Sequence, residues 1–197
     1  MPAAAATDDL RDRIADAALR CVARYGVAKT TLDDVAREAG CGRATIYRIF
    51  RGGKSEVLLA VLQREVVRGE ASIEAAIGGA DDLESLLISG VLAAARLLRG
   101  HEALRFLLAH EPDVVLPLMS FDRLDALIRH ATAFAAPHLA RFVGESDAQR
   151  AAEWVVRIAL SYSLNPSDHI DPTDEDDVRR LVATYLLPAV APVTTRS

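Results

Sequence analysis

The residues best suited to chemistry in this chain lie between Thr31 and Lys54, and their chemistry is that of nucleic-acid recognition. Five cations fall within residues 37–54, against one acid, Glu38. Arginine can donate two hydrogen bonds to a guanine edge, threonine can contact a base, and tyrosine can reach a phosphate. Any one of these side chains alone is more often a solvated surface group, but their spacing favours a shared role. The candidate DNA-contacting residues are Thr31, Arg43, Ala44, Thr45, Tyr47, Arg48 and Lys54.

Two short helices joined by a tight turn must position these side chains. A Thr-x-x-Asp pattern that begins at Thr31 can cap the first helix, and Gly40 can end it in a left-handed conformation. The second helix is expected over residues 43–49, with Ile46 and Phe50 turned inward. Seven helical residues span about 10 Å, which fits a major groove about 12 Å wide. The segment therefore predicts a helix-turn-helix.

The segment from Thr31 to Lys54 resembles the DNA-binding signature of the TetR (tetracycline repressor) family of bacterial regulators. The family pattern has a threonine, an Ala-Gly turn, a Tyr-x-x-Phe stretch and a lysine that opens the fourth helix. The positions that match it are Thr31, Val35, Ala36, Ala39, Gly40, Cys41, Ala44, Ile46, Tyr47, Phe50 and Lys54. Two positions depart from it, because Gly42 stands where a capping serine is usual and residues 51–53 add one residue before the lysine.

The resemblance implies an all-α protein of about nine helices. Residues 1–53 would form a three-helix helix-turn-helix DNA-binding domain, and residues 54–197 a helical ligand-binding and dimerisation domain. It further implies a transcriptional regulator, usually a dimeric repressor that a small hydrophobic ligand releases from a palindromic operator in double-stranded DNA. A ligand-enhanced DNA binder or activator stays open on the same residues, as do a helical protein-interaction module and a helical enzyme.

The hydrophobic pattern predicts the remaining helices, and no segment has the alternation typical of a strand. We expect residues 1–7 to be a disordered tail, Gly26 to end the first helix, and Pro137 to kink or interrupt a later one. The helices are expected over residues 8–25, 54–77, 81–99, 102–110, 121–142, 147–164 and 174–187.

The last two helices carry apolar stripes that need a partner. One short recognition helix contacts only a few base pairs, whereas a two-fold dimer contacts two half-sites about 34–36 Å apart, or a multiple of that spacing. The resemblance implies that these helices pair with their copies, although their stripes could instead complete the core of a single chain. The expected interface residues are Trp154, Val155, Ile158, Tyr162, Val178, Leu181, Val182 and Tyr185.

The middle helices supply the candidate ligand pocket. Pockets are mostly apolar with a few placed polar groups, and residues 81–142 hold many large apolar side chains. With only five Phe, four Tyr and one Trp in the chain, we expect an aliphatic or acyl-type ligand rather than a large planar one. The candidate lining residues, each of which could also be plain core, are Phe106, Leu107, His110, Met119, Phe121 and Phe134.

Composition and spacing argue against catalysis, a metal centre and a membrane span. The net charge of −5 divides into +2 over residues 1–56 and −7 over residues 57–197, so an acidic chain can still present a basic DNA-facing surface. No catalytic motif or metal-ligand spacing is found, and no cofactor is expected. Cys21 and Cys41 are expected to be buried, reduced thiols. Because no apolar run approaches about 18 residues, we expect a cytoplasmic protein.

Overall fold

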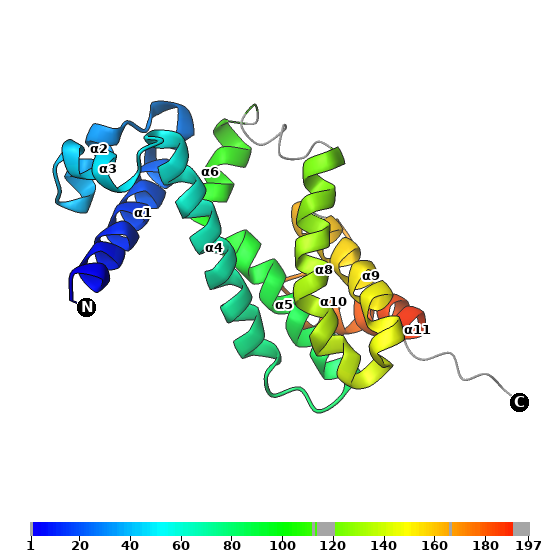
Figure 1. Cartoon of the computed structure of the whole chain (residues 1–197). Coiled ribbons are helices and arrows are strands. Elements are labelled where there is room, and N and C mark those ends of the chain that lie inside the picture. The colour runs from blue at the N-terminus through cyan, green and yellow to red at the C-terminus, as the bar shows by residue number, and fades with distance from the viewer. Residues whose placement is uncertain (1, 112, 114–120, 166, 191–197) are drawn as a thin grey trace, which may run out of the picture. The chain divides into compact units, whose positions relative to one another are not determined.

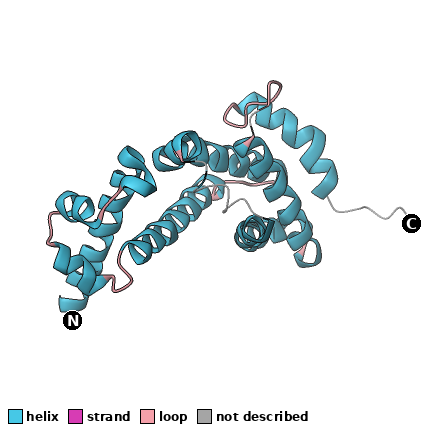
Figure 2. Cartoon of the chain, turned by 90° about the horizontal axis from the view of Figure 1, so that it is seen from above, coloured by secondary structure: helices cyan, strands magenta, loops and turns pink. Residues whose placement is uncertain are grey.

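The structure is a computed structural model that describes residues 2–111, 113, 121–165 and 167–190. The elements in these ranges are all helices (Figure 2), so the predicted all-α fold is confirmed. The chain divides into two compact units: unit 1 comprises Met1–Arg68 with His101–Pro117, and unit 2 comprises Gly69–Gly100 with Leu118–Ser197. The predicted boundary between residues 53 and 54 lies inside unit 1, so the functional division at that point stays a prediction.

Unit 1 contains the helix-turn-helix. Its helices are α1 (Pro2–Lys29), α2 (Leu32–Ala39), α3 (Arg43–Ile49), the first part of α4 (Lys54–Ile77) and α6 (Glu102–His110) (Figure 1). Helix α1 packs against α2, α3 and α6. Small side chains let these helices approach closely, and the core consists of Ile14, Ala17, Ala18, Cys21, Val35, Ala36, Ile46, Phe50 and Val57 with their neighbours.

Unit 2 is organised around the pair formed by α8 (Phe121–Val143) and α9 (Glu145–Leu164), which pack along each other (Figure 1). Helix α5 (Leu83–Gly100) lies against α9. The remaining elements are the end of α4, α10 (Glu175–Leu181), a π-helical turn η2 (Val182–Leu186) and α11 (Leu187–Val190). The core is aliphatic, with Leu86, Leu87, Val91, Leu139, Ala152, Val178, Leu181, Val182 and Leu186 among its buried members.

Of three expectations about helix boundaries, one is confirmed and two need correction. Helix α1 begins at Pro2, where a disordered tail through residue 7 was expected. The predicted stop at Gly26 is confirmed, because this residue leaves helical geometry, with φ +81° and ψ 171°, and a separate short helical stretch follows to Lys29. Pro137 lies inside α8 without ending it; the missing backbone donor is tolerated because Ala136 and Leu139, on either side, are anchored in the core of unit 2.

The expected final helix is present but is not a single α-helix. Asp174 caps its start, since its carboxylate accepts from the amide of Asp177 at 3.0 Å. The π turn over Val182–Leu186 then separates α10 from α11. A π turn inserts one residue into the helical repeat, so the residues that follow present a different face from the one that a 3.6-residue period predicts. None of the described helices has the length and apolarity that crossing a bilayer requires.

Candidate nucleic-acid interface and ligand cavity

The turn between α2 and α3 is fixed by hydrogen bonds at both ends of α2. The Thr31 hydroxyl accepts from the Asp34 amide at 3.2 Å, and the Asp34 carboxylate accepts from the Thr31 amide at 3.1 Å. The hydrogen bond from the Thr31 hydroxyl, more than any other contact, lowers the pKa of Asp34. Gly40 adopts the left-handed conformation, with φ +66°, and the Cys41 amide donates to the Ala36 carbonyl at 2.9 Å. The predicted capping box and glycine stop are both present.

Helix α3 has an inner side that packs in the core of unit 1 and an outer side that is exposed. Ile46 and Phe50 are fully buried, and the guanidinium of Arg11 lies 4.5 Å from the centre of the Phe50 ring. The outer side holds candidate DNA-contacting residues: Arg43, Ala44, Tyr47 and Arg48 are exposed and Thr45 is half-buried. The structure therefore places these five candidate side chains together on one short helix, where the sequence pattern predicted them.

Arg43 already has protein partners on this outer side. Its guanidinium donates to the Asp33 carboxylate at 2.9 Å and to the Tyr47 hydroxyl at 3.4 Å, and it lies 5.6 Å from the centre of the Tyr47 ring. The contact with Tyr47, followed by the charge of Asp33, raises the pKa of Arg43. Because both residues of the Arg43–Asp33 pair are more than half exposed, the pair stabilises the fold little, and Arg43 can exchange Asp33 for a DNA acceptor at small cost.

At the start of α4, we expected the Lys54 ammonium to lie beside backbone amides without hydrogen-bond partners, and the structure differs from this expectation. The Lys54 ammonium donates to the Val27 carbonyl at 2.6 Å. The Gly52 amide donates to the Glu56 carboxylate at 2.7 Å, so an acid already occupies part of the helix start where a phosphate was expected. An ammonium has three donors, and Lys54 therefore keeps the capacity for a further contact.

Glu111, directly after α6, holds the end of α1 and was missed by the sequence analysis. Its carboxylate accepts from the amide of Val27 at 2.7 Å and from that of Ala28 at 3.2 Å. These amides follow Gly26, where a Cβ atom would lie 2.2 Å from a Glu111 oxygen. The partners are more than 80 residues apart in sequence, and no local pattern signals such a contact.

The two cysteines differ in environment. Cys21 is buried, and this burial raises the pKa of its thiol. Cys41, in the turn before α3, is only half-buried, which corrects the expectation that both thiols are enclosed. Across the described ranges, no three His, Cys, Asp or Glu side chains are arranged to hold a metal ion.

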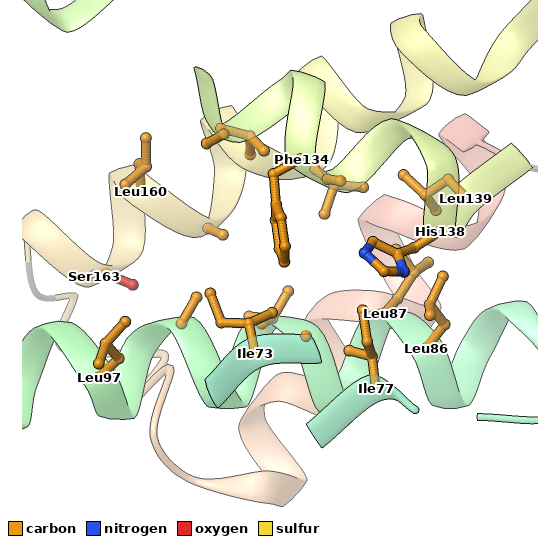
Figure 3. A pocket seen from close by; sticks show the side chains of 18 of the residues that line it. Ile73, Ile77, Leu86, Leu87, Leu97, Phe134, His138, Leu139, Leu160 and Ser163 are labelled. Atoms are coloured by element: carbon orange, nitrogen blue, oxygen red, sulfur yellow. The ribbon is translucent and has the colours of Figure 1, made fainter. Parts of the chain in front are cut away.

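Unit 2 contains a cavity of about 210 Å³ that is partly open to its surroundings (Figure 3). We call it the unit 2 cavity. Its walls come from the end of α4, α5, α8 and α9, and are almost wholly carbon; they include Ile73, Ile77, Leu86, Leu87, Val91, Leu97, Phe134, His138, Leu139, Val155, Val156, Ala159, Leu160 and Ser163. No Asp, Glu, Lys or Arg side chain lines it.

Only one of the six candidate pocket residues, Phe134, lines this cavity. Phe106, Leu107 and His110 belong to α6 in unit 1, where the rings of Phe106 and His110 stack on each other at 4.5 Å. Met119 and the side chain of Phe121 lie outside the described residues. The prediction placed the pocket in the middle helices but overlooked the end of α4 and α9, because a cavity between helices distant in sequence leaves no local signal.

The candidate dimer residues divide by burial. Trp154 and Tyr185 have 46% and 56% of their surface exposed, and Ile158 and Tyr162 are half-buried. Three of the eight need correction: Val178, Leu181 and Val182 are at most 1% exposed within the single chain, so they complete the core of unit 2 and leave no surface for a partner. Val155 lines the cavity.

A capped helix-turn-helix with an exposed, cationic second helix on an all-α chain defines a helix-turn-helix DNA-binding protein. Residues 14–61 match the sequence profile "Bacterial regulatory proteins, tetR family". An uncharacterized HTH-type transcriptional regulator of Mycobacterium tuberculosis is 28% identical over 192 residues, covering 95% of this chain and 89% of that protein. The HTH-type regulator SrpR of Pseudomonas putida is 49% identical over 59 residues, which are 30% of this chain and 27% of that protein.

The fold is similar to the crystal structure of AlkX, a TetR family repressor from Dietzia sp. strain DQ12-45-1b implicated in biodegradation of n-alkanes. The TM-score is 0.65 at 25% identity, covering 90% of this chain and 98% of that one. Residues 14–61 thus form a DNA-binding domain of the TetR family of bacterial regulators, and the protein is a DNA-binding transcriptional regulator. That family is one of regulators, not of enzymes.

Proposed function

We propose that the protein is a homodimeric repressor that binds a palindromic operator and leaves it when a small hydrophobic molecule fills the unit 2 cavity. The observation that carries the proposal is the pairing of an exposed, cationic α3 in unit 1 with a cavity in unit 2 whose walls are almost wholly carbon. The first suits DNA and the second suits an apolar effector. On this proposal, residues 1–53 are the DNA-binding part and residues 54–197 the ligand-binding and dimerisation part.

The DNA-contacting side chains have different roles in this proposal. Arg48 and Thr45 contact base edges, because they lie on the outer side of α3 and have the donors that major-groove acceptors require. Tyr47, Thr31 and Lys54 contact phosphates and set the position of the helix. Arg43 takes either kind of acceptor once it leaves Asp33. Ala44 allows the helix to approach the bases closely.

The dimer rests on exposed aromatic surface and on the size of α3. Trp154 on α9 and Tyr185 on η2 are large side chains with about half their surface exposed, and aromatic side chains are enriched at protein interfaces. A seven-residue helix contacts only a few base pairs, so specific binding requires a second copy. The proposed interface therefore keeps Trp154, Ile158, Tyr162 and Tyr185. It omits the buried Val178, Leu181 and Val182 and the cavity-lining Val155.

An apolar ligand fits the cavity because its lining holds no Asp, Glu, Lys or Arg, and His138 is its one titratable side chain. Moving an ionised group into a cavity lined by carbon carries a large desolvation penalty unless a counter-charge is present. AlkX, to which this chain is similar, is implicated in n-alkane biodegradation, and that supports an aliphatic effector here. To release DNA, the ligand must favour the DNA-incompetent state; a differential affinity of about 1–3 kcal/mol gives roughly 5–150-fold coupling.

The proposal is tested by titrating the purified protein against labelled DNA from the region flanking its own gene. We expect saturable binding, a dimer in light scattering at micromolar concentration, and release when an aliphatic ligand is added. Arg48→Lys should change the base preference. Lys54→Met should weaken all sequences alike and reduce the salt slope by about 1. A monomer in solution would contradict the dimer, and tighter DNA binding with ligand would favour the ligand-enhanced alternative.

A further inference from the structure

We propose that the unit 2 cavity takes a slender, uncharged aliphatic molecule of about eight non-hydrogen atoms, with one terminal oxygen that hydrogen-bonds the Ser163 hydroxyl. This inference deepens the proposed function and rests on it for its regulatory meaning, but the binding itself is testable without DNA. A medium-chain primary alcohol is the simplest member of the class.

The size limit comes from the volume of the cavity. An engineered apolar cavity of about 150 Å³ in another protein holds one benzene, which has six carbons. The unit 2 cavity measures about 210 Å³, so the same ratio gives about eight non-hydrogen atoms. Ligand pockets for drug-sized molecules usually exceed about 300 Å³, and the unit 2 cavity is too small for them.

The absence of charge follows from the lining. Its polar side chains are His138 and Ser163, and the remaining lining residues are aliphatic apart from Phe134 and Gly90. At Ser163, a carboxylate or an ammonium would be buried without an ion-pair partner, because His138, the one titratable side chain of the lining, lies at the opposite end of the cavity (Figure 3). The ligand must therefore be neutral, and most of its surface must be hydrocarbon.

The position of the oxygen follows from Ser163. Its hydroxyl oxygen is buried and has no hydrogen-bond partner among the described residues. Serine in a helix can satisfy itself by donating to the carbonyl four residues earlier, but Ser163, in the last turn of α9, does not. A buried hydroxyl without a partner is costly, and a ligand oxygen at this end of the cavity would satisfy it.

The two polar side chains are separated by hydrocarbon. Figure 3 shows Ser163 and His138 at opposite ends of the cavity, with the Phe134 ring pointing into the space between them. The His138 ring already contacts Phe134, with ring centres 5.2 Å apart. A chain with its oxygen at Ser163 thus extends past Phe134 toward Leu86 and Leu87 of α5 (Figure 3), and a linear ligand fits this arrangement better than a compact one.

Calorimetric titration of the DNA-free protein with linear primary alcohols from butanol to decanol tests the size. Each added methylene should raise affinity about fourfold until about eight non-hydrogen atoms are reached, after which affinity should level off or fall. Affinity that keeps rising through decanol would overturn the size assignment. Hexanoate and hexylammonium should bind at least tenfold more weakly than 1-heptanol, and equal binding would overturn the neutrality.

The hydrogen bond is tested by comparing 1-heptanol with 1-chloroheptane, which has the same length but no hydroxyl group. Ser163→Ala should weaken 1-heptanol about tenfold and leave 1-chloroheptane nearly unchanged. Ser161→Ala, an exposed serine on the same helix, is the matched control and should change neither. If Ser163→Ala weakened the binding of both ligands equally, the assignment of the oxygen to Ser163 would be overturned. It would also be overturned if His138→Phe, rather than Ser163→Ala, removed the preference for 1-heptanol over 1-chloroheptane.

Failure of this inference is distinguishable from failure of the proposed function. If the alcohols bind as described but the DNA complex persists, the repressor mechanism is wrong and the ligand class stands. If another compound releases the DNA while no alcohol binds the free protein, the ligand class is wrong and the repressor mechanism stands.

Discussion

Unit 1 and unit 2 hold their helices together in different ways. In unit 1, polar side chains join helices at many points: Arg20 to Glu38 at 2.6 Å, Arg68 to Asp16 at 2.8 Å, and Glu111 to the end of α1. In the described part of unit 2, fewer such contacts join the helices, among them His130–Glu70 and Arg99–Asp171 with a similar degree of exposure, and the aliphatic core contains the cavity. Directional bonds fix a geometry, whereas aliphatic packing around a cavity tolerates change in shape.

This difference matches the two proposed tasks. A DNA-contacting helix must keep its side chains in one register with the groove, and the bonds around α2 and α3 do this. A ligand-responsive unit must have two arrangements of similar free energy, and the unit 2 cavity leaves space for a second one. The predictions below test this contrast.

The largest effect is expected from the core of unit 1. Phe50→Ala should lower the free energy of unfolding by about 3–5 kcal/mol and abolish DNA binding, because Phe50 is fully buried under α3. Denaturant unfolding and a gel shift measure the two effects. Tyr47→Ala is the control, since Tyr47 is 44% exposed; it should weaken DNA binding with little loss of stability. Equal stability losses in the two variants would contradict the assigned inner and outer sides of α3.

The contact between Gly26 and Glu111 should give the next largest effect. Gly26→Ala should cost about 1–3 kcal/mol, because Gly26 has φ +81° and an added Cβ would meet the Glu111 carboxylate. In a Glu111→Ala background the same change should cost less, since the clash is gone. Gly100→Ala, where a Cβ atom meets nothing within 4 Å, is the control. A double-mutant cycle by denaturant unfolding measures the coupling, and additive costs would refute the contact.

The acid sensitivity of unit 2 should depend on Asp171. The hydrogen bond from Arg99, followed by those from Thr173, lowers the pKa of Asp171 to about 2. A lowered pKa contributes stability that is present above about pH 4 and is lost as the pH falls toward 2. Asp171→Asn should therefore be less stable than wild type at pH 7, with the difference vanishing near pH 2. Unfolding curves measured from pH 7 to pH 2 test this prediction, with Asp168→Asn, a change at an exposed acid, as the control. A stability difference between Asp171→Asn and wild type that does not depend on pH would contradict it.

The smallest effect is expected at Asp33. Asp33→Asn should raise DNA affinity about two- to fivefold, because it removes a negative charge beside α3 and frees Arg43 from its partner. Asp176→Asn in unit 2 changes the net charge by the same amount at an exposed site and should leave affinity unchanged. Fluorescence anisotropy at two salt concentrations measures both. An equal gain in both variants would mean that only total charge matters.

The same contrast explains what the sequence could predict. The capping box at Thr31, the stop at Gly40 and the buried pair Ile46 and Phe50 are all determined within a few residues of chain, and the structure contains each of them. Helices α4 and α6 begin and end where the pattern indicated. Local signals were sufficient because caps and helical periodicity act within one or two turns.

The features that escaped prediction all depend on residues far apart in sequence. Ser163 and His138 look like ordinary helix residues until α8 and α9 pack, and Glu111 looks like a helix end until it meets Val27. The apolar stripe of α10 fitted either a dimer interface or a core, and the choice depended on whether α5 covers it. In the structure, Val178 and Leu181 are buried, so the stripe belongs to the core.

The central claim is that α3 contacts DNA as half of a symmetric pair. A footprint of the protein on DNA flanking its own gene tests it most directly, with wild type compared to Arg48→Lys. We predict protection of two inverted half-sites whose centres are about 34–36 Å apart, or a multiple of that distance, and a changed base preference in the variant. Protection that is uniform along the DNA, confined to a single unpaired site, or unaltered in the variant would contradict the claim.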